Sequence, residues 1–228
     1  MAALTPRWIA RGFPRLALLA LTWCALTGGV FSGCRGLFTP AIPEPPKGAP
    51  IVLNYRSPES TLVTMARGMQ AKADGAAAWL GAFADSSRPE DGPGYHQFFD
   101  LADVVGCACD APSDWGRKDE EEFYLYFLDT VHPSDDFVVY FDPYEHESDP
   151  VPTETVVILN RRYRVVALGL DETATVIAIG WGRIQFEKIA ADRWLITRWH
   201  DHIDPDLVIP PGDLEQLTFG RRRLESPR

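Results

Sequence analysis

Apolar residues recur at helical spacing between residues 57 and 75. Four of them occupy positions i, i+3, i+4 and i+7 and so share one helix face: Leu62, Met65, Ala66 and Met69. Ser57 suits the N-cap of this helix, and Pro58 suits its first turn because proline lacks the N–H that would be unpaired there. Gly75 ends the helix or begins a turn. The pattern predicts an amphipathic helix that begins at residue 58.

Two more helices and a short strand are predicted before residue 131. A short helix over residues 76–84 turns three large side chains inward: Trp79, Leu80 and Phe83. Residues 95–99 predict a short strand. A third helix, over about residues 114–130, has an acidic first half, which suits the positive end of a helix. Its buried stripe comprises Phe123, Phe127 and Val131.

The period changes after residue 136. Four segments rich in Val, Ile, Thr and aromatic residues predict strands: 137–141, 155–168, 175–189 and 194–201. Helices followed by strands indicate an α+β fold. Long consecutive strands with short links favour an antiparallel sheet with strong twist, which curls and leaves a concave side for helices to close.

This order of elements resembles the nuclear-transport-factor-2-like fold, also called the cystatin-like or SnoaL-like cone. The resemblance covers about residues 55–202, and its local features are SPESTL at 57–62 and RWLITRW at 193–199. It implies three N-terminal helices packed on a strongly curved antiparallel sheet. The chain also looks like bacterial lipoproteins of this fold that have no assigned activity.

The first 34 residues have the pattern of an export signal. Arg7, Arg11 and Arg15 precede an uncharged run over 16–33, and small residues lead to Cys34. Residues 31–34 resemble a lipobox, with Phe where that motif usually has Leu. We expect a signal peptide over 1–33 and a diacylglycerol on the Cys34 thiol. Secretion without a lipid and an uncleaved membrane helix are the alternatives.

Proline density and charge define the rest of the domain plan. Residues 34–50 hold the lipidated cysteine and a proline-rich stalk, 51–204 form the folded domain, and 205–228 form a C-terminal tail. Three of the 22 basic residues and none of the 32 acidic ones lie in 1–33, so the remaining chain carries a net charge of −13. This charge argues against nucleic-acid binding. We expect a cell-envelope location, on the outer membrane facing the periplasm if the host has two membranes.

Aromatic residues predict the lining of a cavity inside the cone. The candidates are Trp79, Phe83, Phe123, Phe127, Tyr163 and Trp181. An apolar cavity with few polar groups suits a small hydrophobic ligand. The alternative, which we favour, is that these side chains pack against one another and leave no cavity.

Polar candidates cluster at the end of the last predicted strand. His200 and His202 share one strand face, and Asp204 follows them, which is a spacing compatible with a metal or with acid–base chemistry. The alternative, which we favour, is that the sheet ends here and meets water. Enzymes of the resembling fold work inside the cone with Asp, Tyr or His, but none of their motifs matches this sequence. We expect no catalytic residue, metal or cofactor.

Three other groups are assigned structural roles. Cys107 and Cys109 lie two residues apart, so a bridge between them would be strained, and C-x-C is not the spacing of thiol–disulfide enzymes. Arg162 and Arg164 share a strand face, which suits a solvated outer surface paired with acidic residues or an anion site. Residues 145–149 form an acidic loop without the calcium-loop pattern.

Three functional hypotheses follow from these observations. We favour a non-catalytic, lipid-anchored binding or scaffold module of the cell envelope, with a homodimer or an envelope protein as its partner. The second is a binding protein for a small hydrophobic ligand. The third, by analogy with the fold, is a lyase, isomerase or hydrolase that uses an Asp or His inside the cone.

Overall fold

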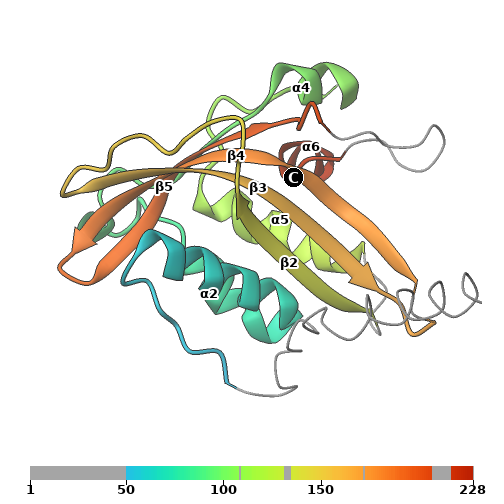
Figure 1. Ribbon diagram of the computed structural model, residues 1–228, viewed down its shortest axis with the longest axis horizontal. Helices are drawn as coiled ribbons and strands as arrows, with labels where there is room; N and C mark the ends of the chain where they lie inside the picture. The colour runs from blue at the N-terminus through green and yellow to red at the C-terminus, as the bar shows by residue number, and fades with distance from the viewer. Residues whose placement is uncertain (1–49, 108, 131–134, 172, 207–216, 228) are drawn as a thin grey trace, which may run out of the picture. The chain divides into compact units, whose positions relative to one another are not determined.

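A five-stranded sheet organises the part of the chain that the computed structural model describes, which comprises residues 50–228 apart from 108, 131–134, 172, 207–216 and 228 (Figure 1). The predicted signal peptide, Cys34 and almost all of the stalk lie outside these residues. None of the helices in the described part has the length and apolarity that a bilayer crossing requires.

The sheet has the order β1-β5-β4-β3-β2. Its strands are β1 His96–Phe98, β2 Asp136–Pro143, β3 Val156–Leu168, β4 Ala174–Ala190 and β5 Arg193–His202. Strands β2 to β5 pair antiparallel, as the sequence predicts, whereas β1 pairs parallel with β5. Four of the five strands therefore form an antiparallel meander, and the short edge strand arrives from the helical part of the chain.

Helices precede the four antiparallel strands, and one helix follows them. The α-helices are α2 Pro58–Gln70, α3 Ala76–Leu80, α4 Leu101–Cys107, α5 Arg117–Asp129 and α6 Phe219–Glu225, and two 3₁₀ turns are η1 Lys72–Gly75 and η2 Pro89–Asp91. The α+β class is confirmed, and α2, α3 and α5 are the three predicted helices. Helices α4 and α6 were not predicted.

Local hydrogen bonds explain where the predicted helices begin and end. Ser57 caps α2 through a reciprocal pair in which its Oγ accepts from the Ser60 N–H at 3.1 Å and its N–H donates to the Ser60 Oγ at 2.9 Å. Helix α3 ends at Leu80 rather than at residue 84, because Ala82 and Ala84 bond with the Ile196 backbone at 2.8 and 3.0 Å. Pairing with β5 thus stops the helix four residues early.

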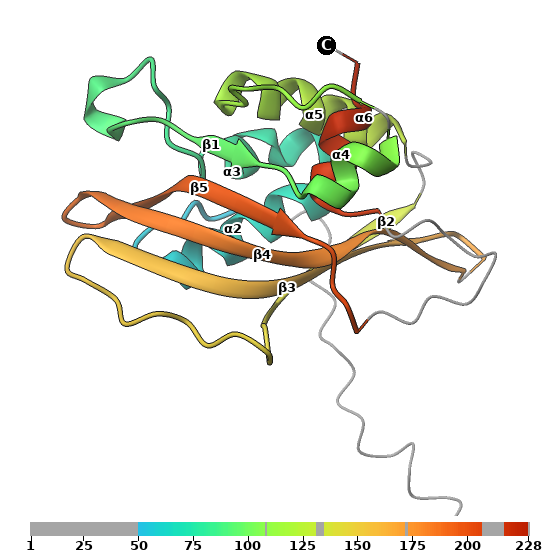
Figure 2. The ribbon, with the colours of Figure 1, turned by 90° about the horizontal axis from the view of Figure 1, so that it is seen from above.

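Helices α3, α5 and α6 lie over one face of the sheet (Figure 2). The predicted inward side chains Trp79, Phe123 and Phe127 are all fully buried there. Val131 lies outside the described residues. On the opposite face, Tyr144 from the β2–β3 connection stacks on Trp181 at 4.6 Å between ring centroids. The core therefore lies between the sheet and the helices, where the resemblance to the cone fold implies it.

Two glycines of β4 make room for large side chains in this core. A Cβ on Gly180 would lie 2.6 Å from the Tyr163 hydroxyl and 2.8 Å from the His202 carbonyl oxygen, and one on Gly182 would lie 2.5 Å from the Trp199 indole nitrogen. Trp181 between them points to the other face, because strand side chains alternate. The glycines therefore allow Tyr163 and Trp199 to lie flat across the sheet.

We predict that Gly180→Ala destabilises the fold by about 1–3 kcal/mol, because the new methyl group overpacks the core and one of its contacts is backbone that cannot rotate away. Urea unfolding measures this. Gly116→Ala is the control: its Cβ would meet atoms only at 3.7 Å or beyond, so we expect a loss below about 1 kcal/mol. Equal losses in both variants would contradict the packing argument.

Candidate functional site

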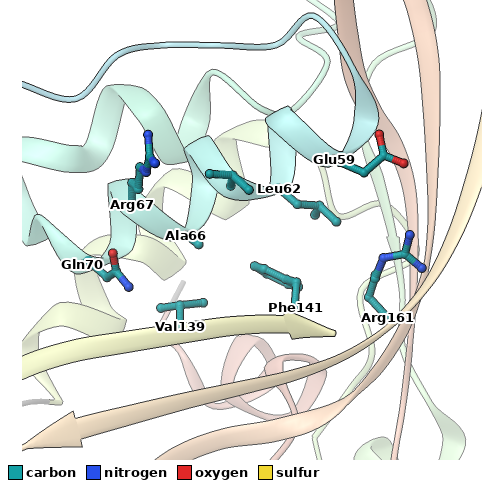
Figure 3. Close-up of a pocket in the computed structure, with 9 residues that line it drawn as sticks. Glu59, Leu62, Ala66, Arg67, Gln70, Val139, Phe141 and Arg161 are labelled. Atoms are coloured by element: carbon teal, nitrogen blue, oxygen red, sulfur yellow. The ribbon is translucent and has the colours of Figure 1, made fainter. Parts of the chain in front are cut away.

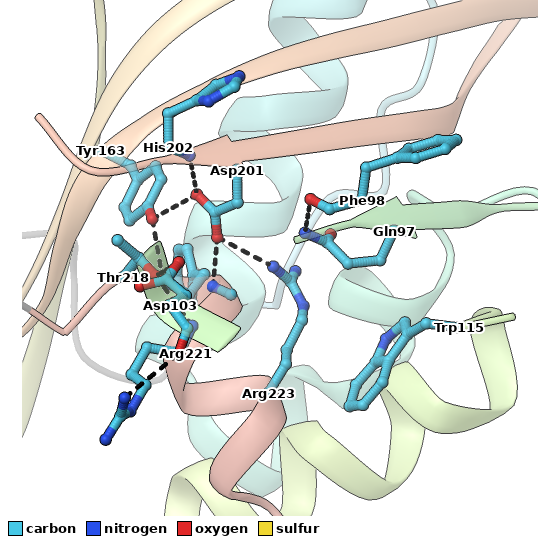
Figure 4. Close-up of polar contacts among 12 residues, drawn as sticks. Gln97, Phe98, Asp103, Trp115, Tyr163, Asp201, His202, Thr218, Arg221 and Arg223 are labelled. Atoms are coloured by element: carbon cyan, nitrogen blue, oxygen red, sulfur yellow. Dashed lines mark hydrogen bonds and ion pairs between the residues drawn. The ribbon is translucent and has the colours of Figure 1, made fainter. Parts of the chain in front are cut away.

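Three segments that are far apart in the sequence bring polar side chains together inside the cone (Figure 4). Tyr163 of β3 donates its hydroxyl hydrogen to Asp201 Oδ1 of β5 at 2.6 Å. The first turn of α6 meets this pair, because the Phe219 N–H donates to the Tyr163 oxygen at 2.9 Å and the Gly220 N–H donates to Asp201 Oδ2. Both Asp201 oxygens therefore accept hydrogen bonds from buried donors.

Arg223 of α6 forms a fully buried ion pair with Glu120 of α5. Its Nε and Nη2 each donate to one Glu120 oxygen at 2.9 Å, and its Nη1 lies 3.7 Å from Asp201 Oδ2. The guanidinium lies over the Trp199 ring at 4.8 Å, and over those of Phe123 and Phe219. A two-pronged pair and three aromatic faces offset the cost of removing this charge from water.

The N-cap of α6 is held by a second buried carboxylate. Thr218 caps the helix by accepting from the Arg221 N–H at 2.9 Å, and its hydroxyl donates to Asp103 Oδ2 of α4 at 2.6 Å. The short helix α6 is thus tied to α4 by Thr218, to β5 by Gly220 and to α5 by Arg223.

Burial shifts the ionisation of this cluster. It raises the pKa of Asp201 to about 7, although Arg223 and the hydrogen bond from Tyr163 act in the opposite direction. Burial also raises the pKa of Asp103 to about 6, against the hydrogen bond from Thr218. The pKa of Tyr163 lies well above its usual range for the same reason. A carboxyl near neutrality is a common feature of acid–base sites, so the access to Asp201 decides what it can do.

Phe219 packs against Tyr163, the hydrogen-bond partner of this carboxyl, at 4.7 Å between ring centroids. Its ring is fully buried and contacts five aromatic rings: Trp79, Phe123, Phe127, Tyr163 and Trp199. Of the six predicted lining residues, all but Trp181 meet in this core, and those five are 0–1 % exposed. Four of these five, all but Phe83, surround the ring of Phe219.

Two surface pockets lie outside this filled interior. The first, of about 290 Å³, lies between α2 and the strands β2 and β3 (Figure 3). Its lining comprises Glu59, Leu62, Val63, Ala66, Arg67, Gln70, Val139, Phe141 and Arg161. The second, of about 350 Å³, lies between β1, α4 and Trp115. Neither lining contains any of the six predicted aromatic residues.

The predicted polar candidates lie on the outer side of β5. His200 and His202 share a face, as their spacing predicts, and their rings stack on Phe98 at 4.1 Å and on Trp181 at 4.2 Å. Asp204 is buried and pairs with Arg162. Within the described residues no three His, Cys, Asp or Glu side chains are grouped to hold a metal ion. The carboxylate that faces inward is that of Asp201, which lies between the two histidines in the sequence and points to the opposite face of β5.

The remaining predicted groups have structural partners. Cys107 and Cys109 are joined by a disulfide at the end of α4. In the 145–149 loop, Glu147 pairs with Arg183 at 3.0 Å and Asp149 pairs with Arg161 at 2.9 Å. Arg164 lies over the Tyr140 ring at 4.9 Å. These contacts fit the solvated outer face and loop that the sequence favours.

No family model matches the chain, and no curated protein matches it in sequence. Solved structures similar to it include the beta subunit of benzoate 1,2-dioxygenase from Burkholderia mallei, with 13 % identity and a TM-score of 0.45 over 68 % of this chain and 94 % of that one. A protein of the nuclear-transport-factor-2-like family from Streptomyces avermitilis has 10 % identity and a TM-score of 0.43 over 62 % and 88 % of the two chains. A protein of unknown function from Mycobacterium tuberculosis has 11 % identity and a TM-score of 0.44 over 72 % and 80 %. The element order and curved sheet of the described domain are themselves those of the nuclear-transport-factor-2-like cone.

We predict that Asp201 makes the fold less stable as the pH rises from 5 to 8. Its pKa is about 7 in the folded chain and has its ordinary value of 3.8 in the unfolded one, so folding binds a proton between these values. The resulting stabilisation is complete below pH 4 and is lost as the pH rises through 7, a change on the order of 2 kcal/mol between pH 5 and 8. Guanidinium unfolding at several pH values measures it.

Asp201→Asn is the matched variant for this experiment, because it removes the titration and keeps the size of the side chain. The raised pKa of Asp103 and the lowered pKa of His200 affect both proteins, so the informative quantity is the difference between the two pH profiles. Parallel profiles would contradict the assignment of the shift to Asp201.

Proposed function

We propose that this protein is a lipid-anchored cell-envelope protein whose domain is a non-catalytic binding or scaffold module. The observation that supports a non-catalytic role is the occupation of the cone interior by Phe219 and Arg223 of α6. A general acid or base must lie within hydrogen-bond reach of its substrate. Asp201 has its hydrogen bonds to Tyr163 and Gly220 and no exposed face, so a substrate has no route to it while α6 is in position.

We predict that Phe219→Ala opens a binding cavity that the wild-type interior lacks. Removing a buried phenyl group costs about 3–5 kcal/mol and leaves an apolar void that can hold a small aromatic molecule. Benzene should therefore raise the melting temperature of Phe219→Ala and leave that of the wild type unchanged. The control is Phe98→Ala, which truncates a ring that is 41 % exposed and creates no enclosed void. Benzene stabilising the wild type equally would indicate an interior that is already open.

The lipid anchor is the second part of the proposal. It rests on the order of a basic start, an uncharged run and small residues before Cys34. Two or three acyl chains hold a protein firmly on a bilayer, since each buried methylene contributes roughly 0.8 kcal/mol. An envelope location would place the folded domain where an envelope protein, a second copy or a small ligand is its natural partner.

We predict that the chain, expressed in a bacterial host, incorporates labelled palmitate and loses residues 1–33, and that Cys34→Ser abolishes both events. Cys24→Ser, a second thiol of the same leader, should leave both unchanged. Autoradiography and intact mass measure the outcome. Label that persists in Cys34→Ser, or a wild-type chain that keeps its leader without label, would overturn the anchor.

A further inference from the structure

The pocket between α2 and β2, called here the α2–β2 groove, has apolar walls and charged ends (Figure 3). Leu62 and Ala66 of α2 face Val139 and Phe141 of β2 across it. Glu59 and Arg161 lie at one end, and Arg67 and Gln70 at the other. A concave apolar surface with a few placed polar groups is the usual character of a small-molecule site, and about 290 Å³ is at the small end of the range.

The Arg161 guanidinium lines the groove, and the hydrogen bonds that it makes to described residues all come from one nitrogen, Nη1. Its side chain is 10 % exposed, and Nη1 donates to both oxygens of Asp149 at 3.0 and 2.9 Å and to the Asn160 carbonyl at 2.8 Å. These contacts fix the guanidinium plane. Its Nε and Nη2 have no hydrogen-bond partner among the residues that the structure describes, so a buried arginine offers an unpaired pair of parallel donors to the groove.

The geometry points to a small monocarboxylate with an apolar body as the ligand of the α2–β2 groove. The Nε–Nη2 edge of a guanidinium fits the two oxygens of one carboxylate, which gives two parallel charge-assisted hydrogen bonds. The body of the ligand lies between Leu62 and Phe141, where it removes apolar surface from water. Glu59 at the same end places a negative charge near the bound anion, and this disfavours ligands that carry a second negative charge.

This inference names a ligand class for the binding module proposed above and rests on that proposal. It is tested by isothermal titration of the full chain with 4-phenylbutyrate, and with 4-phenyl-1-butanol and 4-phenylbutylamine as compounds with the same body. We expect 4-phenylbutyrate to bind at least roughly ten-fold more tightly than the alcohol, because a charge-assisted pair contributes about 1.5 kcal/mol or more. Equal affinity for the acid and the alcohol would overturn the inference.

Two variants locate the site. Arg161→Gln should remove the preference for the acid, whereas Arg67→Gln, at the far end of the groove, should change the affinity less than three-fold. Because Arg161→Gln also releases Asp149 and can weaken the fold, Ala66→Phe provides an independent block: its ring fills the groove between the apolar walls and should abolish binding. Binding that survives Ala66→Phe, or that depends on Arg67 as strongly as on Arg161, would overturn the assignment. Either failure leaves the benzene experiment on Phe219→Ala unaffected, so the closed interior is judged separately.

Discussion

The buried pair of Arg223 and Glu120 is the interaction on which the arrangement of this domain depends. Two opposite charges without access to water are stable only together, since removal of either partner leaves an uncompensated buried charge. The pair joins α6 to α5. Two hydrogen bonds from residues just before Arg223 hold the start of α6: Thr218 donates to Asp103, and Gly220 donates to Asp201. These three contacts, all made within residues 218–223, fix the register of α6 inside the cone.

This register determines which parts of the cone remain available to a ligand. Phe219 occupies the deep part, and the Tyr163–Asp201 pair satisfies itself with the first N–H groups of α6. Arg161 lies on the same face of β3 as Tyr163, two residues earlier, yet it faces the open α2–β2 groove. Phe141 lines the groove, and its ring lies 6.2 Å from that of the buried Trp199. The α2–β2 groove is therefore the outer part of the cone, and Phe219 fills the inner part.

The spacing of apolar residues was sufficient to predict the long elements, in which that spacing repeats several times. Strands β2 to β5 agree with the predicted ranges to within about two residues, and α2 begins at the predicted Pro58, because their apolar positions repeat over many residues. The end of α2 was predicted less well, since it lies at Gln70 and a 3₁₀ turn covers the remaining residues to Gly75. Helix α6 was missed because it is seven residues long and rich in arginine, so it forms through tertiary contacts rather than through local pattern. The available signals were Thr218 as an N-cap and the i, i+4 spacing of Phe219 and Arg223. The parallel pairing of β1 has no counterpart in a local sequence pattern.

The candidate site shows why aromatic content alone does not reveal a cavity. The predicted lining residues do converge, apart from Trp181, which the alternation with Gly180 and Gly182 turns to the other face. A packed core and an open pocket use the same side chains. The difference here is the ring of Phe219, which belongs to the segment predicted to be a C-terminal tail. Similarly, Asp201 faces inward, whereas His200 and His202 on either side of it face outward. Residues that are adjacent in the sequence and resemble a metal site there therefore lie on two opposite faces of β5. Whether the interior is open, and which side chains face it, depends on contacts between segments that are distant in the sequence. Composition and local spacing carry no information about those contacts.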